Sequence, residues 1–284
     1  MKINPVFEDV ASHEVQVEYS HLKNAFHTSS LPLFFLYIGA FPEYLSYITS
    51  QLVINVEHAG YKKMTKYISE SIKDLTHESL TKSDERIHWE ELYKNTPAFY
   101  HFQKNLQEIY RVNTELAIIF IALREAIKGW AVAAKKLEDC TYSESLHQNI
   151  PIKDEDFIFN QEFEYKDELS TEEKHRKITT SGSEVVINSS SPIQKDLLRE
   201  YLSLCRNDFT LHMMDEEFVI LRLGVEKMIL SSLDSLPSVI HSPINTVLKL
   251  TTKYPNFPEL LYLLSEHFPT CAVQRLLFSA YMSV

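Results

Sequence analysis

The segment TELAIIFIALREAIKGWAVAAKK, residues 114–136, is the most apolar long stretch of the chain and decides the fold class. Apolar residues, among them Ile118 and Ile119, fall on nearly every side of a helical projection, which predicts a helix that is buried on most sides. Arg124 and Glu125 interrupt the stretch, so it lacks the run of about 20 apolar residues that a membrane span requires. We therefore expect a core helix of a globular protein.

The composition of the whole chain agrees with a helical fold. Its 284 residues include only 5 glycines, and the Asn-Gly and Asp-Gly pairs of tight hairpins do not occur, which argues against a β-rich protein. Lysine and arginine number 28 against 39 acidic residues, for a net charge of −11. No basic field is then present to neutralise phosphates, so we expect neither a nucleic-acid partner nor a membrane.

The cysteines and the N-terminus indicate the compartment. Cys140, Cys205 and Cys271 lie far apart, and no pair has the two-residue gap of a redox or zinc motif. They are typical of small buried thiols in a reducing environment. The first residues lack the apolar segment of a secretory signal, so we predict a cytoplasmic protein.

Helical periodicity recurs along most of the chain. A first helix is expected to begin near Ser12, and Pro42 is expected to cap or kink the helix that precedes it. Residues 76–97 are polar and predict a short helix with loops. Apolar stripes predict further helices over residues 33–41, 43–56, 64–75, 98–110, 193–205, 218–230, 243–253, 258–267 and 271–282.

The composition divides the chain into three parts: a first helical repeat over residues 1–140, an acidic and partly flexible linker over 141–192, and a second helical repeat over 193–284. The repeat rests on Glu18-Tyr19-x-x-Leu22, which recurs as Glu200-Tyr201-x-x-Leu204. Two copies of one helical unit usually pack as a pseudo-dimer with a ligand crevice between them. Chance similarity between two amphipathic helices is the alternative.

The linker itself has two compositions. Its first part alternates acids with aromatic residues such as Phe157 and Phe159, which predicts an extended segment held on the surface by its rings. Residues 169–191 are rich in Ser, Thr, Glu and Lys and predict a flexible connection. The alternative to a solvated linker is an acidic segment that attracts a basic partner.

Three stretches give the chain a resemblance to a known family: Phe41-Pro42-Glu43-Tyr44-Leu45, Ile109-Tyr110-x-x-Asn113, and Gln194-x-x-Leu197-Leu198. With them the chain resembles the group I 2-haloacid dehalogenases, which act on both D- and L-substrates. The resemblance implies an all-α fold of two repeats that form a pseudo-dimer around a buried pocket. It also implies a hydrolase without cofactor or metal, in which a carboxylate-activated water attacks the halogen-bearing carbon of a small carboxylic acid without a covalent intermediate.

The same resemblance assigns site residues. The catalytic carboxylate falls on Glu217, where the family has Asp, and Asn113 matches a residue that lies at the family's pocket. Phe218 follows the acid, and the family's tryptophan-rich pocket is not reproduced. The substrate-binding residues are then Asn113, Phe34, Tyr37, Phe41 and Phe218.

Each of these residues also has a structural interpretation. Glu217 follows two other acids and is typical of the first turn of a helix, where the macrodipole favours negative charge. Asn113 is typical of a turn or cap, and the aromatic residues are typical of a core. The competing function is therefore a non-catalytic helical module that binds a ligand or a protein and has lost the dehalogenase site.

Other chemistries leave no pattern in the sequence. The chain has 12 histidines, but no second His follows another at the i+4 spacing of a helical metal site, and no glycine-rich phosphate loop occurs. We expect no metal and no cofactor, and a homodimer is left open. One observation separates the two functions: an enzyme needs Glu217 buried and facing Asn113 across an apolar cavity, whereas a binding module would have Glu217 in solvent or the cavity filled by side chains.

Overall fold

The chain is helical throughout the part that the structure describes. The computed structural model describes residues 3–141, 154–159 and 192–283, and within these ranges no strand occurs, which confirms the predicted all-α class. In chain order the elements are α1 (His13–Phe26), α2 (Leu33–Ile38), α3 (Pro42–Glu57), α4 (Ala59–Ser79), α5 (Asp84–Tyr93), α6 (Pro97–Thr141), α7 (Asp154–Phe159), α9 (Pro192–His212), α10 (Glu216–Ser232), η1 (Leu233–Ser235), α11 (Ile244–Lys253), α12 (Phe257–Tyr262), η2 (Leu263–His267) and α13 (Phe268–Met282).

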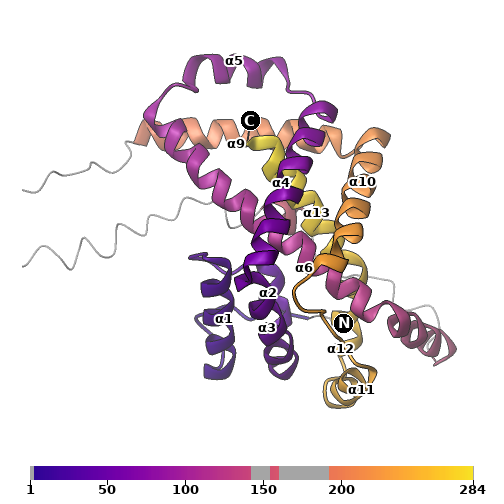
Figure 1. The fold of residues 1–284 in the computed structure, drawn as a ribbon. Coiled ribbons are helices and arrows are strands. Elements are labelled where there is room, and N and C mark those ends of the chain that lie inside the picture. Colours follow the sequence, from indigo (N-terminus) through magenta and orange to yellow (C-terminus); the bar gives the residue numbers. More distant parts are fainter. Residues whose placement is uncertain (1–2, 142–153, 160–191, 284) are drawn as a thin grey trace, which may run out of the picture.

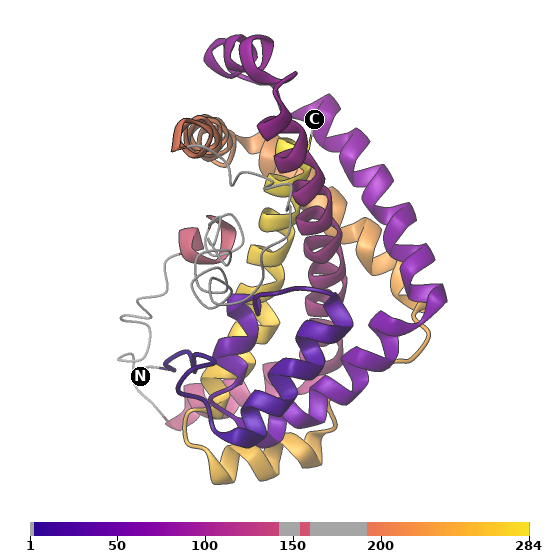
Figure 2. The same cartoon turned by 90° about the vertical axis from the view of Figure 1, so that its left-hand side faces the viewer.

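The centre of the molecule is the contact between α6 and α13, which lie side by side in Figures 1 and 2. Residues 116–123 of α6 are all buried, as the apolar stretch predicts. α13 is buried along almost its whole length, from Phe268 to Met282. Among the described residues, no helix combines the length and the apolarity needed to cross a bilayer.

Two predicted breaks are wrong. Helices were expected over 98–110 and 114–136, but α6 is continuous, because no Gly or Pro interrupts the junction. The Thr114 hydroxyl donates to the Tyr110 carbonyl at 2.9 Å, so this buried polar group has its partner within the helix. A break was also expected after residue 267. Instead α12, η2 and α13 follow one another directly, and η2 is a π-helical turn just before Pro269. Proline has no amide hydrogen to give to the preceding turn, so the wider turn lies where an α-helical bond would be lost.

The first three helices gather at one end of the molecule in Figure 1. Ser12 caps α1, as predicted. Pro42 was expected to cap or kink the helix before it, but α2 ends at Ile38 and Pro42 begins α3, where the first turn tolerates a residue without an amide hydrogen. The Tyr19 hydroxyl donates to the Val6 carbonyl at 2.8 Å directly beside Gly39. A Cβ on Gly39 would lie 1.8 Å from that hydroxyl oxygen, so glycine is required by the close approach of α1 to the end of α2.

The described part of the predicted linker is helical. α7 buries Phe157, Ile158 and Phe159, so the prediction that aromatic rings hold this segment is confirmed and the prediction of an extended backbone is wrong. Three adjacent buried side chains are better presented by one helical turn than by a strand, whose side chains alternate. The rest of the linker, residues 142–153 and 160–191, lies outside the described residues. One continuous buried cluster includes side chains from both predicted repeats, and the limits at 140 and 193 stay a prediction.

A buried acid in the middle of α6 ties three helices together. Glu115 is 2% exposed, and Arg111 Nη1 donates to its two carboxylate oxygens at 2.8 and 2.9 Å. Arg111 also donates to the Phe26 carbonyl at the end of α1, and the Tyr61 hydroxyl of α4 donates to the Glu115 carbonyl. Burial raises the pKa of Glu115 to about 7, although Arg111 opposes this shift.

We predict that this acid makes the stability depend on pH. An unfolded Glu has a pKa of about 4.3, so the contribution of Glu115 to the free energy of unfolding is full below pH 4.3 and is lost as pH rises toward 7. Over that interval the wild type should lose about 1–3 kcal/mol relative to Glu115→Gln, measured by urea denaturation at several pH values. Glu108→Gln is the control, because Glu108 pairs with the same Arg111 but is 71% exposed. Parallel curves for wild type and Glu115→Gln would contradict the prediction.

Candidate functional site

The structure places the predicted catalytic residue in solvent. Glu217 is exposed in the first turn of α10, beside Glu216 and after the N-cap Asp215. This is the position that the helix-dipole interpretation predicts, since first-turn carboxylates face the unpaired amide groups of the helix end. Asn113 is fully buried in α6. The two residues therefore lie in different environments, one in water and one in the core.

The side chain of Asn113 accepts a hydrogen bond inside the core. Its Oδ1 accepts a hydrogen bond from Arg275 Nε of α13 at 2.8 Å. Arg275 is itself 1% exposed, and its Nη1 donates to the Phe157 carbonyl of α7 at 2.9 Å. Asn113 is thus neither a turn nor a cap residue. It joins α6 to α13, and through Arg275 to α7.

The predicted pocket aromatics pack against other rings. Phe34 lies 4.7 Å from Phe120 and 5.2 Å from Phe157 between ring centroids, and the ring of Tyr37 lies 5.5 Å from that of Phe157. Phe41 instead contacts Tyr254 and Phe257, while Phe218 is edge-on to Phe209 at 5.2 Å. The structure therefore brings Phe34 and Tyr37 into one cluster and places Phe41 and Phe218 in two others. Phe34, Phe41 and Phe218 are buried, and Tyr37 is partly buried.

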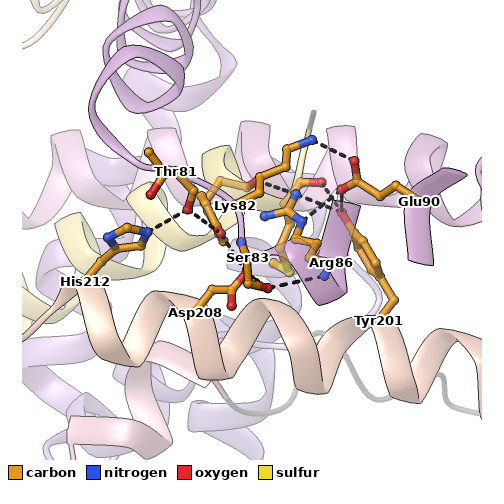
Figure 3. Close-up of polar contacts among 10 residues, drawn as sticks. Thr81, Lys82, Ser83, Arg86, Glu90, Tyr201, Asp208 and His212 are labelled. Atoms are coloured by element: carbon orange, nitrogen blue, oxygen red, sulfur yellow. Dashed lines mark hydrogen bonds and ion pairs between the residues drawn. The ribbon is translucent and has the colours of Figure 1, made fainter. Parts of the chain in front are cut away.

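A second polar centre lies where α5 meets α9 and the end of α13, and it surrounds a buried arginine. Arg86 has no exposed surface. Its Nε donates to Glu90 at 2.8 Å, and its Nη2 donates to the Tyr201 hydroxyl at 3.1 Å and to the Tyr281 carbonyl at 3.0 Å. The guanidinium carbon also lies 4.3 Å from the centroid of the Tyr281 ring. Figure 3 shows Arg86 and Glu90 of α5 meeting Tyr201 of α9.

The same centre continues along α9 through a buried carboxylate. Asp208 Oδ2 accepts from the backbone amide and hydroxyl of Ser83 at 3.2 and 3.1 Å, and from the Tyr281 hydroxyl at 3.0 Å. His212 Nε2 lies 2.8 Å from the Thr81 carbonyl (Figure 3). Ser83 also caps α5 by accepting from the Arg86 amide. The loop between α4 and α5 is therefore held on α9 by side-chain contacts at both ends.

An open cleft of about 420 Å³ lies beside this centre, between α4, α5 and the end of α13. Its lining combines hydroxyl, cationic and apolar groups: Thr76, His77, Leu80, Thr81, Lys82, Ile87 and Tyr281. Lys82 Nζ contacts Glu90 at 2.7 Å on one side of the cleft. Partial burial and the charges of Lys73 and Lys82 hold the pKa of His77 below its ordinary value. The cleft therefore has both cations and acids around it, because Asp74 opposes the effect of the lysines on His77 and Glu90 pairs with Lys82.

One further group of side chains has the chemistry to hold a metal. Asp154 of α7, His267 of η2 and Cys271 of α13 bring one ligand atom each to within 4.8 Å of one another. Burial lowers the pKa of His267, although Asp154 opposes this, and burial raises the pKa of Cys271. A search for two histidines four residues apart overlooks this group, because the residue four positions after His267 is a cysteine.

Comparison with protein-family models, with curated proteins and with solved structures finds no match for this chain. The function must therefore be argued from the residues and their geometry. The polar centre around Arg86 was not predicted, because residues 76–97 were interpreted as a polar short helix with loops and not as part of a buried contact. Its signal is Arg86 four residues before Glu90, with Trp89 between them on the buried side of a short helix.

We predict that the buried guanidinium is required for stability. Arg86→Met should lower the free energy of unfolding by about 3 kcal/mol, because the Tyr281 carbonyl loses the guanidinium donor and the Glu90 carboxylate loses its buried cation. Urea denaturation measures the loss. Lys66→Met is the control, since Lys66 is 78% exposed and its replacement should cost less than about 0.5 kcal/mol. Equal midpoints for Arg86→Met and the control would show that the centre does not stabilise the fold.

Proposed function

We propose that this protein is a non-catalytic helical binding module that holds a small carboxylic acid in the cleft between α4, α5 and the end of α13. The observation that carries the proposal is the lining of the cleft, which pairs a cationic and hydroxylic side with an apolar one. Lys82 and the Thr81 hydroxyl can receive a carboxylate, while Leu80 and Ile87 can cover a short alkyl chain. Its volume of about 420 Å³ suits a small molecule.

Electrostatics support an anionic ligand at this place. The chain carries a net charge of −11, so a small anion is repelled by most of its surface. At the cleft, Lys73 and Lys82 lie close enough to His77 to lower its pKa, while Asp74 opposes them and Glu90 pairs with Lys82. The two lysines can therefore attract a carboxylate that the net charge of the chain would otherwise repel.

The dehalogenase interpretation stays a prediction with less support. A carboxylate in a dry pocket is a stronger base, and desolvation strengthens its hold on a positioned water. Glu217 is exposed and Asn113 is bonded to Arg275, which is the arrangement expected of a module without that chemistry. The two-repeat pseudo-dimer remains part of the proposal, supported by the packing of α6 from residues 1–140 on α13 from residues 193–284. A homodimer and a cytoplasmic location also stay predictions.

Halide release tests the absence of catalysis. The wild type and Glu217→Gln should both release no chloride from D- or L-2-chloropropionate above the protein-free rate, because Glu217 is in contact with water rather than with a buried substrate. An ion-selective electrode measures the release. Turnover by the wild type that disappears in Glu217→Gln would overturn the proposal and identify Glu217 as the base.

Binding of a carboxylate tests the cleft directly. Hexanoate should shift the imidazole NMR signals of His77 saturably, and hexanol, which has no charge, should bind more weakly. Lys82→Gln should weaken hexanoate about threefold to tenfold, because a charge-assisted hydrogen bond is lost at a partly exposed site. Lys66→Gln on the exposed face of α4 is the control and should bind like the wild type. Equal affinity for hexanoate and hexanol, or an unchanged affinity in Lys82→Gln, would contradict the proposal.

A further inference from the structure

The group formed by Asp154, His267 and Cys271 has the dimensions of a metal site. His267 Nε2 lies 3.6 Å from Asp154 Oδ1 and 3.8 Å from Cys271 Sγ, and the three ligand atoms are all within 4.8 Å of one another. Tetrahedral zinc with ordinary bond lengths separates sulfur from nitrogen by about 3.6 Å and nitrogen from oxygen by about 3.3 Å. These two observed separations exceed the zinc values by a few tenths of an ångström, which small side-chain rotations remove, and the ligand atoms of Asp154 and Cys271 lie within 4.8 Å of each other.

The hydrogen bond between Cys271 Sγ and His267 Nε2, at 3.8 Å, does not account for the position of Asp154. A good N–H···O bond spans about 2.7–3.2 Å, whereas the nearest carboxylate oxygen of Asp154 is 3.6 Å from His267 Nε2. The same nitrogen faces the Cys271 sulfur. A neutral imidazole nitrogen cannot donate to the carboxylate and accept from the thiol at once. A cation placed between the three atoms is instead contacted by all of them.

The helices fix two of the three donors. His267 and Cys271 are four residues apart on consecutive helical turns, so their side chains lie on one face. His267 ends the π-helical turn η2, and such turns occur frequently at functional sites. The ring of Phe157 packs edge-on against the His267 ring, with centroids 5.5 Å apart, and so restrains its orientation. Asp154 begins α7 and completes the set from the other side.

The chemistry of the donors and their exposure indicate which class of metal ion the group can bind. We propose that Asp154, His267 and Cys271 bind a divalent transition metal of the zinc class, with a fourth position open to solvent. Thiolate and imidazole donors favour zinc and cobalt over magnesium and calcium. One thiolate and one carboxylate neutralise a divalent ion, which suits a half-buried place. The Cys271 residue is 1% exposed while the Asp154 side chain is 64% exposed, so an ion can enter from the α7 side.

Cobalt(II) titration of the full chain tests the site, because a cobalt–thiolate bond has a charge-transfer band and tetrahedral cobalt has visible d–d bands. The wild type should show both, and zinc should displace the cobalt. Cys271→Ser should abolish the charge-transfer band, and His267→Gln should weaken binding about 100-fold. Cys205→Ser and Cys140→Ser are the matched controls and should keep the band.

A second variant separates a loss of metal binding from a loss of the fold. Asp154→Asn changes an exposed side chain, so it should keep the far-UV circular dichroism of the wild type while binding cobalt about tenfold more weakly. The proposal is overturned if excess cobalt gives the wild type no charge-transfer band. It is also overturned if the band persists in Cys271→Ser, if Asp154→Asn binds as tightly as the wild type, or if either control loses the band. None of these outcomes depends on whether hexanoate binds at the cleft.

Discussion

The burial of one guanidinium organises the end of the molecule where α5, α9 and the C-terminal part of α13 meet. A charge with no exposed surface must be surrounded by acceptors, and Arg86 receives them from Glu90, Tyr201 and the Tyr281 carbonyl. The last carbonyls of a helix lack partners within it. Arg86 supplies the donor for Tyr281, and the Tyr201 hydroxyl donates to Met282. The last turn of α13 can therefore lie inside the protein rather than at its surface. The cleft lies beside this turn.

The sequence predicted most helices because their causes are local. Ser12 and Pro42 set helix starts, and the continuous apolar run in residues 114–136 set a buried helix. The wrong predictions concern the junctions between consecutive helices, where the local sequence pattern is ambiguous. Nothing in the chain around Thr114 breaks a helix, so two expected helices are one. A break was expected after residue 267, but a widened turn before Pro269 keeps the backbone helical.

The functional residues were harder to predict because they depend on distant partners. The resemblance predicted that Glu217 is the catalytic carboxylate. Its exposure follows instead from the three consecutive acids, which favour a helix start in water. Arg86 meets Tyr201 and Tyr281 across more than a hundred residues of chain, which no local pattern records. Asp154 meets His267 in the same way. Only the four-residue spacing of His267 and Cys271 was visible in the sequence, and it was overlooked because the search required two histidines.

The π-helical turn η2 holds one residue more than an α-helical turn does. Its hydrogen bonds join residues five apart rather than four, so the extra residue is absorbed within 263–267. Deleting one residue from this stretch would leave an α-helical turn, with Arg275 still facing Asn113 and Tyr281 still facing Arg86. A deletion inside α13 would instead turn every later side chain by about 100°, because each residue of an α-helix advances the side-chain direction by that angle. Natural one-residue deletions near this end of the chain should therefore occur in η2 and not in α13.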